Sequence, residues 1–385
     1  MSTQLDTLRA EIEELSLHLL QTLNRRAHRA LDIAREKQRL GAPLRDPYRE
    51  SQLLDRLVQN NEGPLDAPSV RAVFRGILDA SVTLMEGRRQ QGLRVGAAAG
   101  PAVGVTVRGH TIGGAEPIYI AGPCSIENED QLEAAARGLA ALGVRFFRAG
   151  AFKPRTSPYA FQGLGDRGLR LLRDTAARHG LLTVTEATST DNADTVAEYA
   201  DVIQIGARNM YNYDLLRAVG RTGKPVLLKR GFAATLDEWL NAAEYIALSG
   251  SERIVLCERG IRTFSRETRA TLDLSIVPLA RAASRLPVLV DVSHAAGRRD
   301  ILTPLARAAF ACGAHGVMVE VHPDPDVALS DGEQQITIED FAALQRAVRE
   351  GLFELAAALA PAAPQRSNGE HVSHVARLAV AGGQS

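Results

Sequence analysis

Four side chains of the types that bind metal ions lie between residues 124 and 331, each close to a short apolar run. Cys124 stands in GPCS, His294 in DVSH, Glu320 in VMVEVH and Asp331 in LSDGEQQ. A thiolate, an imidazole and two carboxylates together suit a divalent transition metal such as manganese, iron, cobalt or zinc. A lone cysteine after proline is by itself more typical of a small buried residue. The four types together predict a metal site if the fold brings them to one place.

Seven cations follow the same kind of apolar run, and they predict a ligand with several negative charges. They are Arg148, Lys153, Arg155, Arg208, Lys229, Arg230 and Arg259. Two phosphates, or a phosphate and a carboxylate, would match such a set, whereas ion pairing with outer helices is the alternative for some members. The chain has no Walker loop and no GxSxG elbow, which disfavours P-loop nucleotide binding and serine hydrolysis.

Eight short runs with strand composition supply these residues, and segments of helical composition separate them. A residue that ends a run recurs about every 28 residues, which is the repeat of a (β/α)8 barrel. The runs are apolar on both faces, as buried parallel strands are. The sequence therefore predicts an α/β fold with a (β/α)8 barrel over residues 105–360, with its site at the carboxyl ends of the strands. The stretch VTVRGHTI predicts a strand pair that closes the opposite end.

The N-terminal part is predicted to be a separate three-helix all-α domain over residues 1–90. Apolar residues recur every three or four positions from Leu5 to about Arg39, which indicates one long helix. Asp46 followed by Pro47 predicts the start of a second helix, and a third should begin between Asp66 and Pro68. A long first helix in so small a domain predicts pairing with a second copy, as a homodimer or homotetramer.

The remaining segments carry less structural signal. The Gly- and Ala-rich residues 91–104 predict a flexible linker, and residues 361–385 predict a disordered tail. The 45 basic and 45 acidic residues balance, so neither nucleic acid nor a membrane surface is an expected partner. The polar N-terminus lacks signal-peptide character, and three scattered cysteines are not a disulfide framework, so we expect a cytoplasmic protein.

The barrel motifs resemble those of a known family. The stretches GPCS, RAGAFKPRTSPYAFQG, IGARNM, LLKRG, CERGIRTF, DVSH, VMVEVH and LSDGEQQ are similar to the motif set of type I beta 3-deoxy-D-arabino-heptulosonate 7-phosphate (DAHP) synthase. This resemblance implies condensation of phosphoenolpyruvate with erythrose 4-phosphate, the first step of the shikimate pathway. It implies that a divalent ion, with Mn²⁺ preferred over Fe²⁺, Co²⁺ or Zn²⁺, is bound by Cys124, His294, Glu320 and Asp331.

The same resemblance implies roles for individual residues around the metal. Phosphoenolpyruvate would be held by Arg148, Lys153, Ala207, Arg208, Lys229 and Arg259. The erythrose phosphate would face Arg155, Thr156 and Asp291. Lys153 is the expected proton donor to the new alkoxide, and Glu186 the expected acid or base for the attacking water. The chain departs from the family at Val292, where proline is usual, and we expect a small backbone adjustment with no lost ligand.

The alternative for the barrel is the related 3-deoxy-octulosonate 8-phosphate synthase, with the helical domain then serving only oligomerisation. That enzyme typically has an Asn-Arg-Ser-Ser loop where this chain has residues 153–157, KPRTS. The difference favours the four-carbon sugar.

Residues 8–90 resemble an all-helical chorismate mutase, whose site needs cations for two carboxylates and a donor for an ether oxygen. The matching positions are Arg9, Arg26, Lys37, Asp46, Arg49, Glu50 and Ser81. Met85 replaces a glutamine of the family, and a thioether cannot donate a hydrogen bond. Two hypotheses therefore remain open for this domain: a working mutase, or a sensor that binds chorismate or prephenate and inhibits the barrel.

Overall fold

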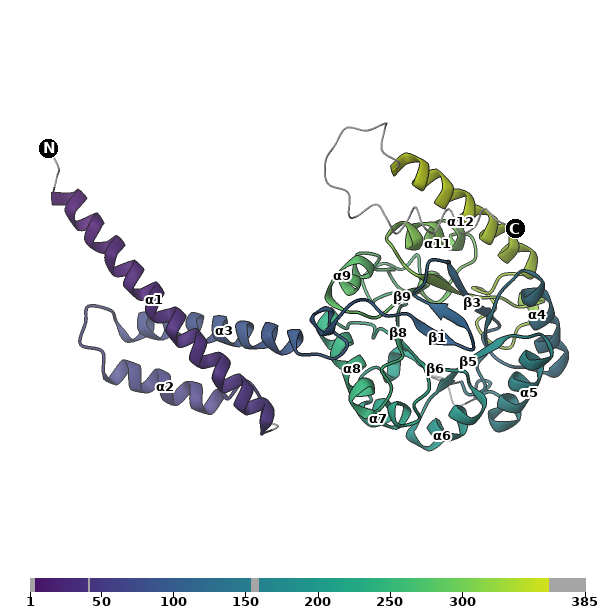
Figure 1. The fold of residues 1–385 in the computed structure, drawn as a ribbon, viewed down its shortest axis with the longest axis horizontal. Coiled ribbons are helices and arrows are strands. Elements are labelled where there is room, and N and C mark those ends of the chain that lie inside the picture. Colours follow the sequence, from purple (N-terminus) through teal and green to yellow (C-terminus); the bar gives the residue numbers. More distant parts are fainter. Residues whose placement is uncertain (1–3, 41, 154–158, 360–385) are drawn as a thin grey trace. The chain divides into compact units, whose positions relative to one another are not determined.

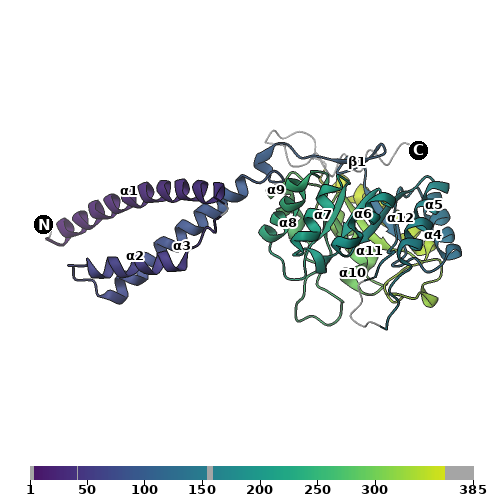
Figure 2. The same ribbon diagram turned by 90° about the horizontal axis from the view of Figure 1, so that it is seen from below.

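The computed structural model describes residues 4–40, 42–153 and 159–359. The chain divides into two compact units between Leu93 and Arg94, a helical unit and a barrel unit, and each is described by itself (Figures 1 and 2). Among the described helices, none is long and apolar enough to cross a membrane. The predicted tail, residues 361–385, lies outside the described residues.

The helical unit contains the three predicted helices. They are α1 (Gln4–Arg39), α2 (Pro47–Gln59) and α3 (Ala67–Gln91). The Asp46 carboxylate accepts a hydrogen bond of 3.0 Å from the Arg49 amide at the start of α2, and Asp66 accepts one of 2.8 Å from the Ser69 amide before α3. Helix α3 contacts both α1 and α2. These N-caps are the reason that both helices begin where the sequence predicts.

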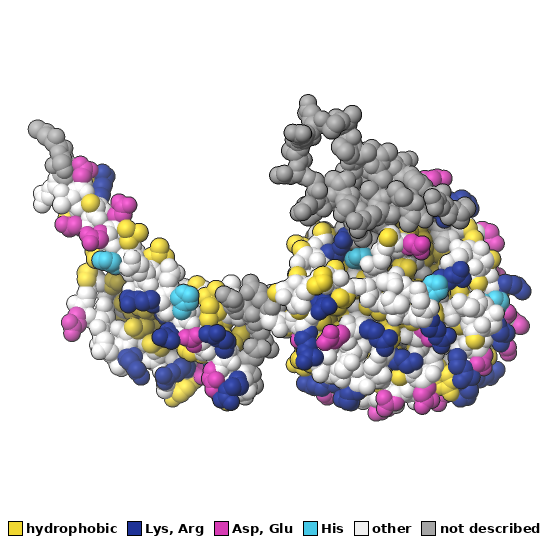
Figure 3. All heavy atoms as spheres, in the orientation of Figure 1, with side chains coloured by type: hydrophobic (Ala, Val, Ile, Leu, Met, Phe, Trp, Pro, Cys, Tyr) yellow, Lys and Arg dark blue, Asp and Glu magenta, His cyan; other side chains and the backbone are white. Residues whose placement is uncertain are grey.

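The first half of α1 exposes a row of large apolar side chains. These residues, spaced three and four apart, are 52–64% exposed: Leu5, Leu8, Ile12, Leu15 and Leu19. Figure 3 shows hydrophobic side chains along this helix. We call this row the α1 stripe. A single copy of the helical unit leaves it without apolar cover among the described residues.

The barrel unit is a closed parallel barrel, which confirms the predicted (β/α)8 fold. Its strands, each paired with the next and the last with the first, are β3 (Ile118–Gly122), β4 (Phe146–Arg148), β5 (Leu182–Ala187), β6 (Val202–Ile205), β7 (Val226–Lys229), β8 (Ile254–Glu258), β9 (Val288–Asp291) and β10 (Gly316–Glu320). In the register, Glu320 of β10 pairs with Gly122 of β3. The strands are buried along almost their whole length, because helices cover the outside and side chains fill the inside.

The outer helices surround this barrel in the order expected for alternating units (Figure 1). They are α4 (Glu129–Ala141), α5 (Gly165–Arg178), α6 (Thr190–Tyr199), α7 (Tyr213–Arg221), α8 (Leu236–Ser249), α9 (Ile276–Ala283), α11 (Leu302–Ala311) and α12 (Ile338–Leu359). Short additional helices follow three strands: η2 (Ala207–Asn209), α10 (Val292–Ala296) and η3 (Pro325–Val327). These three lie at the carboxyl ends of β6, β9 and β10, where the sequence places the site.

The predicted strand pair closes the amino-terminal end of the barrel. Strands β1 (Val105–Val107) and β2 (His110–Ile112) form an antiparallel hairpin. Its Ile112 is fully buried in a cluster with residues from the starts of the barrel strands, among them Phe146 and Leu182. At the hairpin turn, an ion pair of 3.0 Å joins Arg108 to Asp201. The hairpin thus seals the face opposite the predicted site.

The prediction of a flexible linker over residues 91–104 is wrong for most of that segment. The backbone of Val95 and Val103 is hydrogen-bonded to Arg285, and the Val95 amide also donates to the buried Glu244 carboxylate at 3.2 Å. Residues 97–99 form the short helix η1. The apolar Val95, only 2% exposed, is what fixes this Gly- and Ala-rich segment to the barrel unit.

Replacing Ile112 by alanine should test the sealing role of the hairpin. The change removes a fully buried side chain, so we expect the free energy of unfolding to fall by about 2–5 kcal/mol. Leu279→Ala, at a position 54% exposed on α9, is the control and should cost less than about 0.5 kcal/mol. Urea denaturation would measure both. Equal, small losses would show that the hairpin does not contribute to the core.

Candidate functional site

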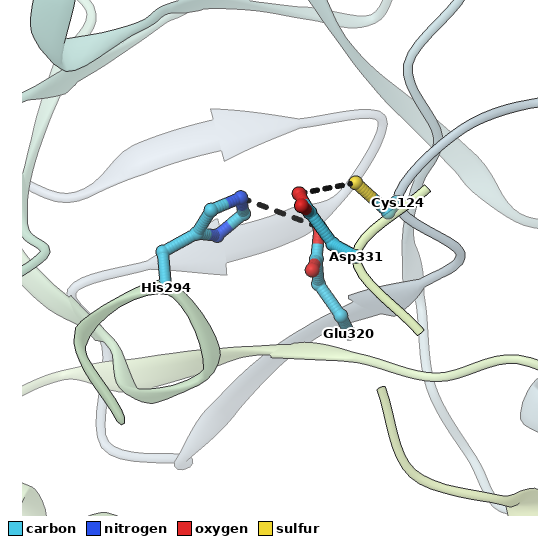
Figure 4. Close-up of side chains that lie close together, drawn as sticks. All are labelled: Cys124, His294, Glu320 and Asp331. Atoms are coloured by element: carbon cyan, nitrogen blue, oxygen red, sulfur yellow. Dashed lines mark hydrogen bonds and ion pairs between the residues drawn. The ribbon is translucent and has the colours of Figure 1, made fainter. Parts of the chain in front are cut away.

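The four predicted metal ligands meet at the carboxyl end of the barrel. Each offers one ligand atom, and these atoms all lie within 4.8 Å of one another. Cys124 follows β3, His294 lies on α10 after β9, Glu320 ends β10, and Asp331 lies in the loop after β10. Figure 4 shows the four side chains pointing toward one another. One sulfur, one nitrogen and two carboxylates converging in this way form a suitable site for a divalent ion.

Two cations neutralise the acidic ligands. Arg148, from the end of β4, donates hydrogen bonds of 2.7 Å to Glu320 and to the Pro123 carbonyl. Lys153 places its Nζ 2.9 Å from the Cys124 sulfur and 3.0 Å from the Cys124 carbonyl. Arg148 and Glu320 are both almost completely buried. Charges so far from water are tolerated only when they are paired, so this pairing is a condition for the site to exist.

His294 is oriented by a carboxylate behind it. Asp291 accepts hydrogen bonds from the Nδ1 and the backbone amide of His294 at 2.8 and 2.9 Å, and it also pairs with Lys229. The hydrogen on Nδ1 leaves the Nε2 lone pair facing Glu320, 3.4 Å away. Such a carboxylate–histidine pair fixes the ring of a metal ligand. Val292 begins α10 and is buried, and His294 keeps its place in the cluster despite the missing proline.

Asp331 is held in an unusual backbone conformation. Its φ of 50° lies in the left-handed region, which is uncommon for a residue other than glycine. The Arg269 guanidinium lies 3.4 Å from one Asp331 oxygen and donates a 2.8 Å hydrogen bond to Gln334. Gln334 in turn donates to Glu320. Strain of this kind persists where the surrounding contacts over-determine the backbone, and here those contacts converge on the ligand cluster.

Burial sets the protonation of the cluster. Burial raises the pKa of the Cys124 thiol to about 11, and the Glu320 charge adds to the rise. Burial also lowers the pKa of His294, which favours the neutral ring that binds metals. For Asp331, burial acts to raise the pKa, but Arg269 and the Cys124 hydrogen bond outweigh it and the pKa falls below its ordinary value. The cluster thus has a neutral imidazole and an ionised Asp331, and a bound cation would favour the Cys124 thiolate.

A cavity of about 140 Å³ opens beside the four ligands. Its wall carries six cations: Arg148, Lys153, Arg208, Lys229, Arg259 and Arg269. The Arg259 guanidinium stacks 4.7 Å from the centre of the Phe232 ring and donates to the His294 carbonyl at 3.2 Å. So many positive charges in one small space favour a ligand with several negative charges.

Glu186 is the acidic group on this wall that lies outside the ligand cluster. The Gln204 amide donates a 2.9 Å hydrogen bond to its carboxylate. The neighbouring Gly206 leaves room for it, because a Cβ there would lie only 2.2 Å from the Glu186 oxygen. Glu186 is therefore held in a fixed position in the cavity.

The structure places most of the other predicted barrel residues in this cavity, with four exceptions. Arg155 and Thr156 lie outside the described residues. Asp291 is fully buried, and its contacts with His294 and Lys229 give no support to the expectation that it faces a sugar phosphate. Arg230 does not line the cavity, because Glu258 and Asp273 hold it in buried ion pairs of 3.0 and 2.8 Å.

Sequence reasoning missed three side chains of the wall. Arg269 comes from the long loop between β8 and α9, Phe232 follows β7, and Gln204 is the polar residue inside the apolar strand β6. Gln204 carried a usable signal, because a polar side chain in a buried strand needs a partner in the barrel interior. Arg269 carried none, since nothing in its local sequence separates it from a surface arginine.

The residues predicted to bind chorismate or prephenate are distributed over the three helices of the helical unit. Arg26 of α1 donates a 2.5 Å hydrogen bond to Ser81 of α3, and Lys37 donates one of 2.7 Å to the Leu44 carbonyl. Asp46, Arg49 and Glu50 stand at the start of α2. Arg9 is separate from them: it is paired with Asp6 on the exposed half of α1, and 17 residues of helix put it about 25 Å from Arg26. Met85 is buried.

Comparison with known proteins gives a family for each unit. Residues 97–354 match the model of the DAHP synthetase I family, and residues 8–86 match that of chorismate mutase type II. The phospho-2-dehydro-3-deoxyheptonate aldolase of Thermotoga maritima is 59% identical over 222 residues, which are 58% of this chain and 66% of that protein. The chain thus spans just under two thirds of that relative.

A second curated protein and a crystal structure also match this chain. The 2-dehydro-3-deoxyphosphooctonate aldolase of Syntrophotalea carbinolica is 35% identical over 248 residues, 60% of this chain and 88% of that protein. The crystal structure of phospho-2-dehydro-3-deoxyheptonate aldolase (DAHP synthase) from Thermotoga maritima superposes with a TM-score of 0.65 at 52% identity, covering 69% of this chain and 77% of that one. The DAHP synthetase I model matches well over half of this chain, so the chain belongs to that family. It also carries a chorismate mutase type II domain before the barrel.

Proposed function

We propose that the barrel unit condenses phosphoenolpyruvate with erythrose 4-phosphate to form DAHP, with the help of a divalent metal ion. The observation that carries the proposal is the convergence of Cys124, His294, Glu320 and Asp331 beside a cavity lined with cations. The name of the 59% identical Thermotoga maritima relative supports the same reaction. We further propose that the protein works in the cytoplasm, where its three free cysteines stay reduced.

We propose Mn²⁺, with Fe²⁺, Co²⁺ or Zn²⁺ as alternatives; the set of one soft, one borderline and two hard ligands suits divalent transition metals as a class. When bound, the ion would supply a Lewis acid that polarises the aldehyde oxygen of the sugar. The chain's own contribution is to keep the ligands in place: Asp291 orients the His294 ring, and Arg148 holds Glu320. These pairings hold two of the four ligand side chains in position.

Cavity cations would align the two substrates. Arg208, Lys229 and Arg259 line the wall on which the phosphate and carboxylate of phosphoenolpyruvate would be held. A fixed clamp of this kind keeps the reacting carbons aligned and removes the entropy cost of orientation during the reaction. The stacking of Arg259 on Phe232 fixes the plane of its guanidinium, which suits two parallel hydrogen bonds to one oxyanion.

We propose that two side chains of the cavity move protons. Lys153 lines the cavity next to Cys124, so it can donate a proton to the alkoxide that forms from the aldehyde. Glu186 lines the same cavity away from the ligands, and its carboxylate can accept a proton from the water that attacks carbon 2 of phosphoenolpyruvate. Its hydrogen bond from Gln204 directs the carboxylate without neutralising it.

The alternative product is 3-deoxy-octulosonate 8-phosphate, formed from arabinose 5-phosphate. The relatives named 2-dehydro-3-deoxyphosphooctonate aldolase are 33–36% identical, among them that of Syntrophotalea carbinolica at 35%, against 59% for the heptonate relative. The loop that separates the two families in sequence, residues 153–157, is largely outside the described residues. We therefore propose erythrose 4-phosphate on the basis of identity and of the KPRTS sequence.

Assays with both aldoses and with controlled metal content should decide this proposal. A chelator should abolish phosphoenolpyruvate consumption, and Mn²⁺ should restore it with erythrose 4-phosphate, because the aldehyde needs a Lewis acid. Arabinose 5-phosphate should react at least about 100-fold more slowly, since its additional carbon and hydroxyl group would leave polar groups of the site unpaired. Full activity in chelator, or a preference for arabinose 5-phosphate, would contradict the proposal.

Replacing Glu186 by glutamine should test its proton transfer. We expect kcat to fall by about 100-fold or more while the KM for phosphoenolpyruvate changes little, because the amide keeps the shape but cannot accept a proton. Glu198→Gln, on the exposed side of α6, is the matched control and should leave kcat unchanged. A Glu186→Gln variant with kcat close to that of the wild type would remove Glu186 from the mechanism.

For the helical unit we propose binding of prephenate or chorismate as a feedback signal. The Arg26–Ser81 hydrogen bond and Lys37 supply cations and donors, while the buried Met85 supplies no donor for an ether oxygen. Rearrangement of chorismate should therefore be weak, whereas the carboxylates can still be bound. Inhibition of the barrel would then follow from linkage between the two sites.

We also propose that a second copy of the chain completes this unit. The α1 stripe exposes five large apolar side chains, and Arg9 lies on the same helix, about 25 Å from Arg26. Pairing of two copies would bury the α1 stripe and would let Arg9 of one copy approach the other cations on its partner. This supports a homodimer, with a homotetramer as two such dimers.

Prephenate titrations of the full chain should test the sensor. We expect prephenate to inhibit DAHP formation, and we expect Arg26→Gln to raise the inhibitory concentration by about tenfold or more, because a charged hydrogen bond to a carboxylate is lost. Arg25→Gln removes an exposed neighbour that contacts only Thr22 among described residues, and it should not change inhibition. Rapid prephenate formation from chorismate would instead identify a working mutase.

A further inference from the structure

A group of contacts joins the loop after β3 to the loop after β10, and we call it the ligand seam. It connects residues 123–128, which include Cys124, with residues 321–335, which include Asp331. The Cys124 amide donates to Gln335 at 2.9 Å, and the hydroxyls of Ser125 and Ser330 lie 2.6 Å apart. The seam therefore sets the distance between two metal ligands that are far apart in the sequence.

Glu127 is the charged member of the ligand seam. One of its oxygens accepts a 2.8 Å hydrogen bond from the Leu329 amide, two residues before Asp331. Its other oxygen faces Nε2 of His322, two residues after Glu320. The side chains of Glu127 and His322 are 6% and 3% exposed. Glu127 thus contacts the loop that carries Asp331 near its start, at His322, and again just before Asp331, at Leu329.

His322 and Glu127 face each other without forming a hydrogen bond. Nδ1 of His322 accepts a 3.0 Å hydrogen bond from the Asp324 amide, so the ring hydrogen must lie on Nε2. Nε2 is buried without a hydrogen-bond partner, and it lies 3.6 Å from the Glu127 oxygen. That separation exceeds the 2.7–3.2 Å of a normal N–H···O hydrogen bond. A buried N–H group without a hydrogen-bond partner is energetically unfavourable. A movement that brings Nε2 closer to the Glu127 carboxylate would therefore be favourable.

We propose that Glu127 and His322 position Asp331 for the metal ion, and that the contact between them would tighten to a hydrogen bond in the ion-bound protein. This inference rests on the proposed metal-dependent function. The left-handed Asp331 and its contact with Cys124 show that the loop already lies against the cluster. Closure of the last gap would be linked to the ion, and removal of the donor should therefore weaken ion binding.

A positioning role and a merely structural role differ in their effect on the affinity for the ion. A hydrogen bond that exists equally with and without the ion contributes to stability but not to ion affinity. A bond that forms only in the bound state contributes to affinity. Partners of metal ligands typically change affinity by about 10- to 100-fold when they are lost, and we expect about tenfold here.

The test is calorimetric titration of the chelator-treated full chain with Mn²⁺. His322→Asn keeps an acceptor for the Asp324 amide and removes the donor that faces Glu127, so Mn²⁺ should bind about tenfold more weakly. His322→Gln places an amide donor near the position of Nε2, and it should bind within about threefold of the wild type. Rescue by the longer side chain would assign the effect to the donor.

His315→Asn is the matched control. His315 is also buried, and its Nδ1 accepts a 3.1 Å hydrogen bond from the Val288 amide, but it lies before β10 at the opposite end of the barrel. This variant should bind Mn²⁺ as the wild type does. Glu127→Gln is the second variant, in case His322→Asn does not fold. Its side-chain oxygen can still accept the hydrogen bond from Leu329, but its amide donor would face the Nε2 donor of His322. Mn²⁺ should therefore again bind about tenfold more weakly.

Unchanged Mn²⁺ affinity in His322→Asn and Glu127→Gln would overturn the inference while leaving the proposed function intact. An equal loss in His315→Asn would also overturn it, because the effect would then be general destabilisation. Failure of the wild type to bind Mn²⁺, Fe²⁺, Co²⁺ or Zn²⁺ would overturn both the inference and the metal-dependent function. The three results are distinguishable within one set of titrations.

Discussion

The site depends on the balance between buried acidic ligands and the cations beside them. Cys124 and Glu320 are completely buried, and Asp331 completes a set of three acidic groups around one point. Unpaired charges at such depth would cost several kcal/mol each. Arg148 and Lys153 reduce that cost, and a divalent ion would remove much of the rest. The same requirement explains the raised pKa of the Cys124 thiol, because burial and then the neighbouring Glu320 charge both disfavour the thiolate.

This balance changes how the cations of the cavity are interpreted. Arg148 is committed to Glu320, and Lys229 to Asp291, while Arg230 is removed from the cavity by two carboxylates. A count of cations taken from the sequence therefore overstates the charge available to a ligand. The argument for a polyanion remains, because Arg208, Arg259 and Arg269 also line the wall, although Arg269 is itself paired with Asp331. It now depends on their positions around one cavity and no longer on their number.

The barrel and its four ligands could be predicted because both follow from periodic features. Buried strands recur at a nearly constant spacing, and parallel strands in a closed barrel bring all their carboxyl ends to one rim, so Cys124, His294 and Glu320 had to meet. The partner of a ligand has no such rule. Asp291 is three residues from His294, yet only its burial and its hydrogen bonds show that it orients the ring. Arg269 reaches the site through a long loop whose path the sequence does not define. The prediction for the segment near Val95 failed for a related reason. Composition predicted flexibility, whereas one buried side chain fixes the segment to the barrel unit.

The two units differ in how much of a site one copy contains. In the barrel unit, a single chain brings the four ligands and the cavity together, so the proposed chemistry needs no second copy. In the helical unit, Arg9 stands on a bare half of α1, apart from Arg26, and the α1 stripe beside it is exposed. An apolar row of this size is costly in water, and its burial by another copy would be favourable. Assembly would then complete the helical unit's site while leaving the barrel's site as it is. Effector sensitivity should consequently depend on protein concentration in a way that the condensation itself does not, which ties regulation to association and separates it from catalysis.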